Sequence, residues 1–270
     1  MIATAADGTR LHYVVEGHGP PIVLVGGKTS NIEGAWWRYI PPLAQRLKVI
    51  AFDNRGAGQT DQPDLPYTTR GMAEDTVGLM DALGIPRAHV CGVSLGGMIA
   101  QELALNHPDR VLSLQLHCTL ARPDAYLLAL GRTWLEMRAA LSREAFTRAM
   151  SLWLFAPATF ATRPEFVEDA VQNVLANPYP STQVGFARQA GAVAGHDTLD
   201  RLDRIRCPTL VTVGTEDILV PPRFARVLGD RIPRAELRML EGGGHGYFIE
   251  LAPAFNEVAL GFLGRHPAGR

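Results

Sequence analysis

A serine set between glycines is the sharpest chemical signal in this sequence of 270 residues. Ser94 stands in Gly92-Val93-Ser94-Leu95-Gly96, directly after the apolar run His89–Val93 and before the helix-compatible stretch Met98–Asn106. A serine on so sharp a strand-to-helix turn is held in a strained backbone conformation, and the glycines two residues before and after it avoid side-chain collisions. The pattern predicts that Ser94 Oγ is a nucleophile presented at the carboxyl end of a sheet.

A serine is a weak nucleophile at neutral pH and needs a base. His245 lies in the glycine-rich segment 241–246, which follows the last apolar run and can bring an imidazole over the edge of a sheet. The other histidines lie in predicted strands, at a helix end or near the termini, and we interpret them as structural or solvated. His196 is the one competitor, but it opens a predicted helix entry, which favours a capping or hinge role.

A carboxylate after a strand between serine and histidine would complete the set. Asp217 follows the apolar run Leu210–Val213 and is the predicted acid, with its neighbour Glu216 as the local alternative. The shorter side chain of Asp217 lies on the loop that leads into the next predicted helix. Serine, acid and histidine then follow one another in the chain order known for one class of serine hydrolases.

Short buried strands must position these residues. Continuous apolar runs suit strands that are buried on both faces, and such strands indicate a mostly parallel sheet between two layers of helices. The predicted strands are Leu11–Val15, Ile22–Val25, Val49–Phe52, His89–Val93, Leu112–Leu116, Leu210–Val213 and Glu236–Leu240.

Residues 119–204 contain no convincing strand and are predicted to form a helical insertion. The stretch Asp124–Leu141 and the segment Thr182–Ala194 are helix-like. Thr162, with Glu165 three residues on, predicts the capping box of a further helix. A helical block inside an alternating pattern favours a lid over a second independent domain.

On these motifs the chain resembles the α/β-hydrolases of the esterase, lactonase and cofactor-free haloperoxidase group, from about Thr9 to Leu263. The segments Phe52–Thr60 and Ile205–Leu210 resemble the family's aspartate-arginine-glycine turn and its approach to the acid. The resemblance implies an α/β-hydrolase fold with a core domain of residues 1–118 and 205–270 and a helical cap of residues 119–204. It implies a triad of Ser94, Asp217 and His245, with no cofactor and no metal.

By position in the family, the backbone N–H groups of Leu95 and Lys28 would form the oxyanion hole. The loop reads Val25-Gly26-Gly27-Lys28 where relatives often carry His-Gly. The position of the second donor is therefore fixed only to within one residue of Lys28. The two glycines resemble the loop of methylesterases that act on polyketide esters. A nucleotide-binding role of Gly27-Lys28-Thr29 is excluded because Ile22 stands where that motif needs glycine.

Apolar side chains near these loops and in the helical insertion predict an apolar substrate pocket. The candidates are Gly27 of the loop and the side chains of Trp36, Trp37, Met98, Trp134, Trp153, Phe155 and Phe248, and any one of these side chains is more often a core residue than a pocket residue.

The composition limits the kinds of partner that this protein can bind. A net charge of −1 excludes a global field that would hold nucleic acid or an acidic membrane. The three cysteines, Cys91, Cys118 and Cys207, are too dispersed for a disulfide framework or a zinc cluster, and we interpret them as core residues. With no signal-peptide or membrane-spanning pattern, we expect a cytoplasmic monomer or homodimer.

The sequence therefore predicts a serine carboxylesterase that acts on a small to medium, largely apolar ester. A lactonase, an enol-lactonase or a polyketide methylesterase stays open as an alternative. A carbon–carbon bond hydrolase, a perhydrolase and a proline iminopeptidase fit less well, and a receptor without turnover fits least.

Overall fold

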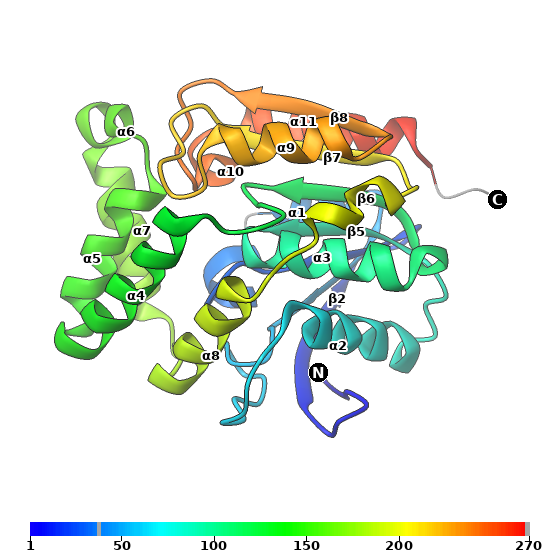
Figure 1. The fold of residues 1–270 in the computed structure, drawn as a ribbon, viewed down its shortest axis with the longest axis horizontal. Coiled ribbons are helices and arrows are strands. Elements are labelled where there is room, and N and C mark those ends of the chain that lie inside the picture. Colours follow the sequence, from blue (N-terminus) through cyan, green and yellow to red (C-terminus); the bar gives the residue numbers. More distant parts are fainter. Residues whose placement is uncertain (37–38, 268–270) are drawn as a thin grey trace.

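Eight strands form a single sheet at the centre of the protein (Figure 1). We describe a computed structural model, which covers residues 1–36 and 39–267. The sheet order is β1-β2-β4-β3-β5-β6-β7-β8, with β3 to β8 parallel and β1 and β2 antiparallel at one edge. The strands are β1 (Ile2–Thr4), β2 (Arg10–Glu16), β3 (Pro21–Val25), β4 (Lys48–Phe52), β5 (Ala88–Val93), β6 (Val111–His117), β7 (Thr209–Gly214) and β8 (Ala235–Leu240).

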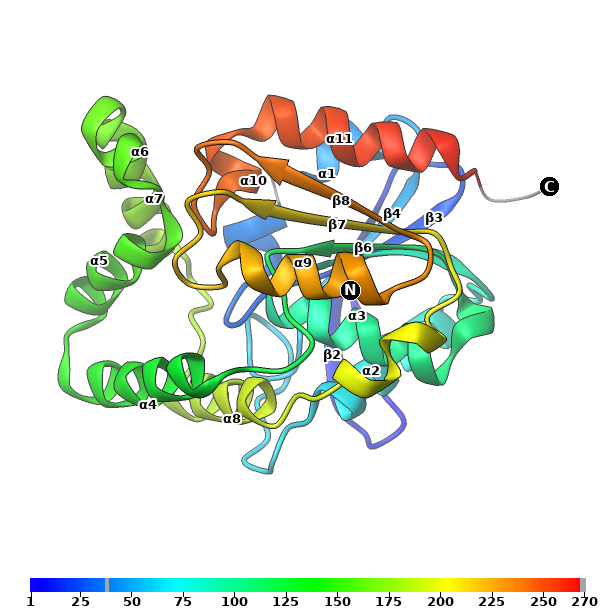
Figure 2. The same cartoon turned by 45° about the horizontal axis from the view of Figure 1, so that its top comes forward.

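Successive strand residues point to two separate cores because side chains alternate across a sheet. On β3, Val23 and Val25 face one core, while Ile22 and Leu24 face the other. Helices α2, α3 and α9 cover the first face and α1 and α11 the second (Figure 2). Their bounds are α1 (Ile40–Ala44), α2 (Thr69–Ala82), α3 (Leu95–Asn106), α9 (Pro222–Arg231) and α11 (Ala252–Arg265), with short helical turns at η1 (Ile32–Trp36), η2 (Pro108–Arg110), η3 (Leu199–Arg204) and α10 (Tyr247–Glu250).

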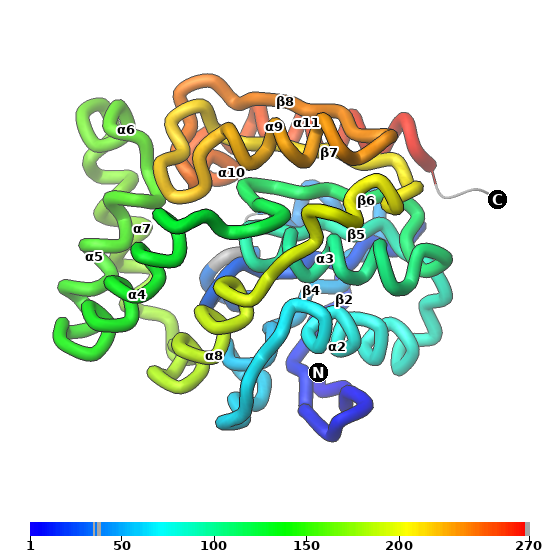
Figure 3. Tube along the Cα trace, in the orientation of Figure 1, coloured from blue at the N-terminus to red at the C-terminus, as the bar shows by residue number. Residues whose placement is uncertain are grey.

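Five helices between β6 and β7 form a group beyond the carboxyl ends of the parallel strands (Figures 1 and 3). We call residues 119–204 the helical segment. Its helices are α4 (Ala125–Ala140), α5 (Arg143–Leu154), α6 (Pro157–Thr162), α7 (Pro164–Ala176) and α8 (Gln183–Ala194). Because parallel strands end at this edge, the loops that follow β3, β5, β7 and β8 face the helical segment.

The predicted fold class, a mostly parallel sheet flanked by helices, is confirmed, and all seven predicted strands are present. The structure adds β1, whose three residues are too short for a recognisable pattern. The capping box at Thr162 is wrong, because Thr162 ends α6 and Pro164 begins α7. The Thr162 hydroxyl donates to the Ala158 carbonyl instead. Within residues 1–36 and 39–267, none of the helices has the length and apolar character needed to cross a membrane.

Candidate active site

Ser94 occupies a strained turn between β5 and α3. Its φ of 54° and ψ of −116° lie in a region that residues with side chains rarely adopt. The turn is anchored from both sides, since Ser94 N–H donates to the His117 carbonyl at 2.8 Å and the Thr119 hydroxyl donates to the Ser94 carbonyl at 2.7 Å. The side chain keeps partial exposure. A substrate can therefore reach the hydroxyl, while the backbone that carries it is held in place.

The flanking glycines are required by close backbone approaches. A side chain at Gly92 would overlap the Gly96 carbonyl, and one at Gly96 would overlap the Val25 carbonyl. A side chain at Gly97 would meet Thr119 at 2.6 Å. The steric reason predicted for glycine on either side of the serine is confirmed by these contacts.

Asp217 and His245 form a buried hydrogen-bonded pair. His245 Nδ1 lies 2.9 Å from Asp217 Oδ2, and both side chains are almost fully buried. The other carboxylate oxygen of Asp217 accepts the backbone N–H groups of Leu219 and Val220 at 2.9 and 2.8 Å. With its acceptors engaged in this way, the carboxylate fixes the imidazole orientation and leaves Nε2 for another partner.

The pKa of His245 is set by opposing effects. Burial lowers it, but the Asp217 carboxylate and the Cys118 thiol raise it well above its ordinary value. We attribute the increase chiefly to Asp217, because the pKa of Cys118 is itself raised by burial and its thiol stays neutral. The protonated imidazole is therefore stabilised at this position.

Cys118 connects the serine and the histidine. Its sulfur lies beside the His245 imidazole and the backbone N–H of Ser94. Ser94, through its backbone, and His245, through its imidazole, thus border the same cysteine, although their side chains are not hydrogen-bonded to each other in the structure. Apo hydrogen bonds of this kind often form only in the substrate complex.

The loop that carries His245 is held by the helical segment. Gly246 N–H donates to the Leu154 carbonyl at 2.7 Å, and Gly244 N–H donates to Glu250 Oε2 at 2.7 Å. The other oxygen of the buried Glu250 side chain accepts Ala156 N–H at 2.9 Å and the Thr159 hydroxyl at 2.6 Å. Glu250 thus ties α6 to the histidine loop.

The loop after β3 and the start of α3 each bring one backbone donor to the site. A side chain at Gly27 would lie 3.4 Å from Ser94 Cβ, so this loop passes directly over the serine. Lys28 follows Gly27, and Leu95 begins α3. In the part of the chain that the structure describes, neither the Lys28 nor the Leu95 backbone N–H donates to a protein acceptor.

Gln189, on α8, connects the helical segment to two loops of the sheet. Its side-chain oxygen accepts Thr29 N–H at 2.6 Å, and its amide donates to the Arg55 carbonyl at 2.8 Å. Thr29 has a φ of 61°, a conformation that costs free energy for a residue with a branched side chain. Gln189 thereby holds the loop next to Lys28 in its unusual conformation.

The predicted pocket residues divide into separate groups. Gly27 lies over Ser94, whereas Trp36 and Met98 are buried in the two cores. Trp134 and Trp153 pack edge to face within the helical segment, with their ring centres 5.6 Å apart. Trp37 lies outside the described residues.

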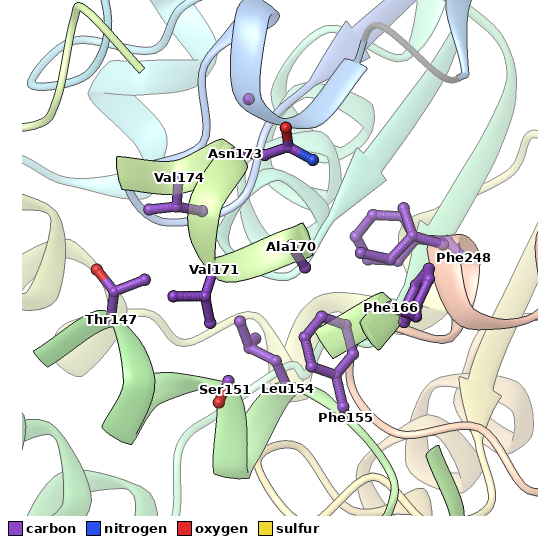
Figure 4. A pocket seen from close by; sticks show the side chains of 12 residues that line it. Thr147, Ser151, Leu154, Phe155, Phe166, Ala170, Val171, Asn173, Val174 and Phe248 are labelled. Atoms are coloured by element: carbon purple, nitrogen blue, oxygen red, sulfur yellow. The ribbon is translucent and has the colours of Figure 1, made fainter. Parts of the chain in front are cut away.

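Phe155 and Phe248 line a cavity of about 170 Å³ between α5, α7 and α10 (Figure 4). Its walls are almost entirely apolar, and Phe166 packs edge to face on Phe155. The cavity adjoins the histidine loop, because a side chain at Gly246 would meet the Phe155 ring at 3.2 Å. Ser94 and His245 are not among the residues that line it.

The two alternatives from the sequence lie elsewhere. Glu216 is exposed. His196 is buried against Thr69, 2.9 Å from its hydroxyl, and burial lowers the pKa of His196 to about 4. Within residues 1–36 and 39–267, no cluster of His, Cys, Asp and Glu is arranged to hold a metal ion.

Cys118, Gln189 and Glu250 were not singled out as site residues from the sequence. Each is defined by a partner far along the chain: Thr29 and Arg55 for Gln189, Gly244 for Glu250 through its tie to Ala156 and Thr159, and His245 for Cys118. No local motif marks them.

Comparisons with known proteins agree with this architecture. The family model described as alpha/beta hydrolase fold matches residues 20–251. A protein of Azorhizobium caulinodans named "Putative carbamate hydrolase RutD" is 34% identical over 254 residues, 94% of this chain and 95% of that protein. The enol-lactonase from Burkholderia xenovorans LB400 has a TM-score of 0.88 and 28% identity, covering 98% of this chain and all of its own. A thermophilic esterase from Thermogutta terrifontis has a TM-score of 0.87 and 28% identity, covering 99% of each chain.

Proposed function

The chain belongs to the alpha/beta hydrolase family, and from this premise we propose that it is a serine hydrolase that cleaves carboxylic esters. The single observation that supports this most is the buried pair of His245 and Asp217 beside the strained turn of Ser94. A nucleophile, a base and an acid that orients the base are the parts that acyl transfer through an acyl-enzyme needs.

The reaction begins when Ser94 Oγ attacks the ester carbonyl and His245 Nε2 takes the hydroxyl proton. Asp217 holds the imidazole through Nδ1 and stabilises its protonated form. The free backbone N–H groups of Leu95 and Lys28 bind the oxyanion of the tetrahedral intermediate. His245 then protonates the leaving alcohol, and water repeats the same steps on the acyl-enzyme.

We propose a cap role for the helical segment, with residues 1–118 and 205–270 as the core domain. The hydrogen bonds through Glu250 and Gln189 support this, because they connect the segment to the histidine loop and to the loop of Lys28. The aromatic cavity beside the histidine loop can take an apolar part of the ester.

A lactone is a second candidate substrate because it is a cyclic ester and needs the same steps. The overall similarity to an enol-lactonase over 98% of the chain favours its inclusion. A carbamate is a further substrate to test, since the relative from Azorhizobium caulinodans is named as a putative carbamate hydrolase.

A substrate panel with the variant Ser94→Ala tests the proposal. We expect the protein to hydrolyse chromogenic esters of graded acyl length, with a lactone, a carbamate and a prolyl amide for comparison. Ser94→Ala is expected to lower kcat by up to about 10⁶-fold, since the nucleophile is lost. If Ser94→Ala keeps more than about a tenth of the activity, or the prolyl amide is preferred, the proposal is wrong.

A further inference from the structure

Lys28 is one of only two lysines among 26 basic residues, and its side chain extends from the loop over Ser94 into the helical segment. Its Nζ lies 3.9 Å from the ring centre of Phe186, on α8, and 4.4 Å from that of Trp134, on α4. The amine is thus placed between two aromatic rings, on the side of the site where the helical segment faces the sheet.

Within the described part of the chain, the Lys28 amine has aromatic neighbours but no polar partner. Among residues 1–36 and 39–267, no hydrogen bond or ion pair reaches Lys28 Nζ. The residue nevertheless keeps partial exposure, so that a small molecule in the site can contact it. Burial lowers the pKa of Lys28 to about 7, because the charged form loses hydration that the two rings replace only in part. A buried ammonium without an anion is costly.

The Lys28 amine is also within reach of the reacting carbonyl. The backbone of Gly27 and Lys28 lies next to Ser94, and an extended lysine side chain spans about 6 Å from Cα to Nζ. Gln189 holds Thr29 N–H and so fixes where this loop points its lysine. A substrate group a few bonds from the scissile carbonyl would meet the amine.

We propose that Lys28 Nζ binds a carboxylate of the substrate, so that the natural substrate is an ester or lactone bearing one anionic group a few bonds from the carbonyl that Ser94 attacks. A single ammonium can neutralise one negative charge, and the rings of Phe186 and Trp134 can contact the carbon chain that carries it. This inference rests on the proposed function. The sequence predicted a largely apolar ester, and this inference adds one anionic group at the end of the apolar chain.

The competing interpretation is a purely structural one, in which the ammonium only joins the loop to α4 and α8 through its two aromatic contacts. Such contacts stabilise a protein but do not distinguish charged from neutral ligands. Selectivity for charge is therefore the property to measure.

Calorimetric binding to Ser94→Ala protein tests the inference without turnover. The ligands are the monomethyl esters of glutaric, adipic and pimelic acid, each paired with the methyl ester in which a primary amide replaces the carboxylate. A second pair, the acetate esters of 5-hydroxypentanoic acid and of its amide, puts the charge on the alcohol side. The charged member of at least one pair is expected to bind about tenfold or more tightly, as hydrogen bonds to charged groups do.

Three further substitutions in the Ser94→Ala background identify the group responsible. Lys28→Met should remove the preference for the charged member, and Lys28→Arg should keep most of it. Lys48→Met is the matched control, because Lys48 begins β4 at the amino ends of the parallel strands, away from the loops of Ser94 and Lys28, and it should leave the preference unchanged.

Equal affinity for the charged and neutral members of every pair, including no measurable binding of either, overturns the inference. A preference that persists in Lys28→Met overturns it as well. The proposed function fails separately, if the protein with Ser94 intact hydrolyses none of the panel.

Discussion

The two halves of the candidate site are built in different ways. Ser94 is carried by a strand, a sharp turn and a helix that adjoin it in sequence, and its turn is anchored by His117 and Thr119 at the end of the neighbouring strand. His245 is positioned by distant residues, since its loop hydrogen-bonds to Leu154 and to Glu250, which in turn binds Ala156 and Thr159. The serine half belongs to the sheet, whereas the histidine half is shared between the sheet and the helical segment.

This difference indicates where each half is vulnerable. Changes in the sheet are expected to affect the serine turn through the fold itself. Changes in the helical segment are expected to displace the imidazole or the loop of Lys28 while the fold persists, because these loops depend on a few hydrogen bonds. Substitutions in each half can test the contrast.

The largest effect on turnover is expected from a change at Asp217, the predicted acid of the site. Asp217→Asn should lower kcat by about 10⁴-fold, because the imidazole loses the group that orients it and stabilises its charge. The acid limb of the pH profile should move as well. His245 must be neutral to act as a base, and Asp217 raises its pKa, so activity should fall as pH falls through this raised pKa.

In Asp217→Asn the pKa of His245 should decrease, and the remaining activity should extend to lower pH. Profiles of kcat/KM for both proteins measure this. A wild-type rate that stays flat down to pH 4, or an acid limb that does not move in the variant, would contradict the assignment of this pair.

An intermediate effect is expected from Glu250, which acts as a positioning residue. In Glu250→Gln one side-chain oxygen becomes an amide nitrogen that cannot accept a hydrogen bond, so either Gly244 N–H or Ala156 N–H loses its buried acceptor and the link between α6 and the histidine loop is broken. We expect kcat to fall about tenfold with KM little changed, and the acid limb to shift, since the imidazole is displaced from Asp217.

The matched control is Glu257→Gln, which changes an exposed glutamate on α11. It should leave both kcat and the pH profile as in the wild type. A Glu250→Gln protein that is less stable but has the wild-type kcat and pH profile would show that the histidine half does not depend on this residue.

The smallest effect concerns stability in the serine half. At a φ of 54° Ser94 carries backbone strain of about 1–3 kcal/mol, which glycine relieves and alanine does not. Since each kcal/mol shifts Tm by about 2–4 °C in a protein of this size, Ser94→Gly should unfold at a Tm at least about 2 °C above that of Ser94→Ala. Thermal unfolding followed by circular dichroism compares the two variants, and equal Tm values would argue against strain at the turn.

The strands and the serine turn could be predicted because their signals are local. All seven apolar runs form strands in the structure. The glycines around Ser94 lie where the backbone approaches too closely for a side chain, as their spacing predicts. Pairing Asp217 with His245 needed only the order of strands, since both follow parallel strands that end at one edge. Local signals failed at Thr162, where proline at 164 starts a new helix instead.

The sequence by itself determined the sheet and the serine turn, and it indicated the candidate nucleophile, acid and base, because periodicity, glycine spacing and residue type are read over a few positions. Only the tertiary structure showed how Glu250, Gln189 and Lys28 contact the loops of the candidate site. Gln189 is hydrogen-bonded to Thr29, 160 residues away in sequence, and Glu250 to Ala156, 94 residues away. Such contacts depend on how the helical segment packs against the strand ends, which no short stretch of sequence encodes.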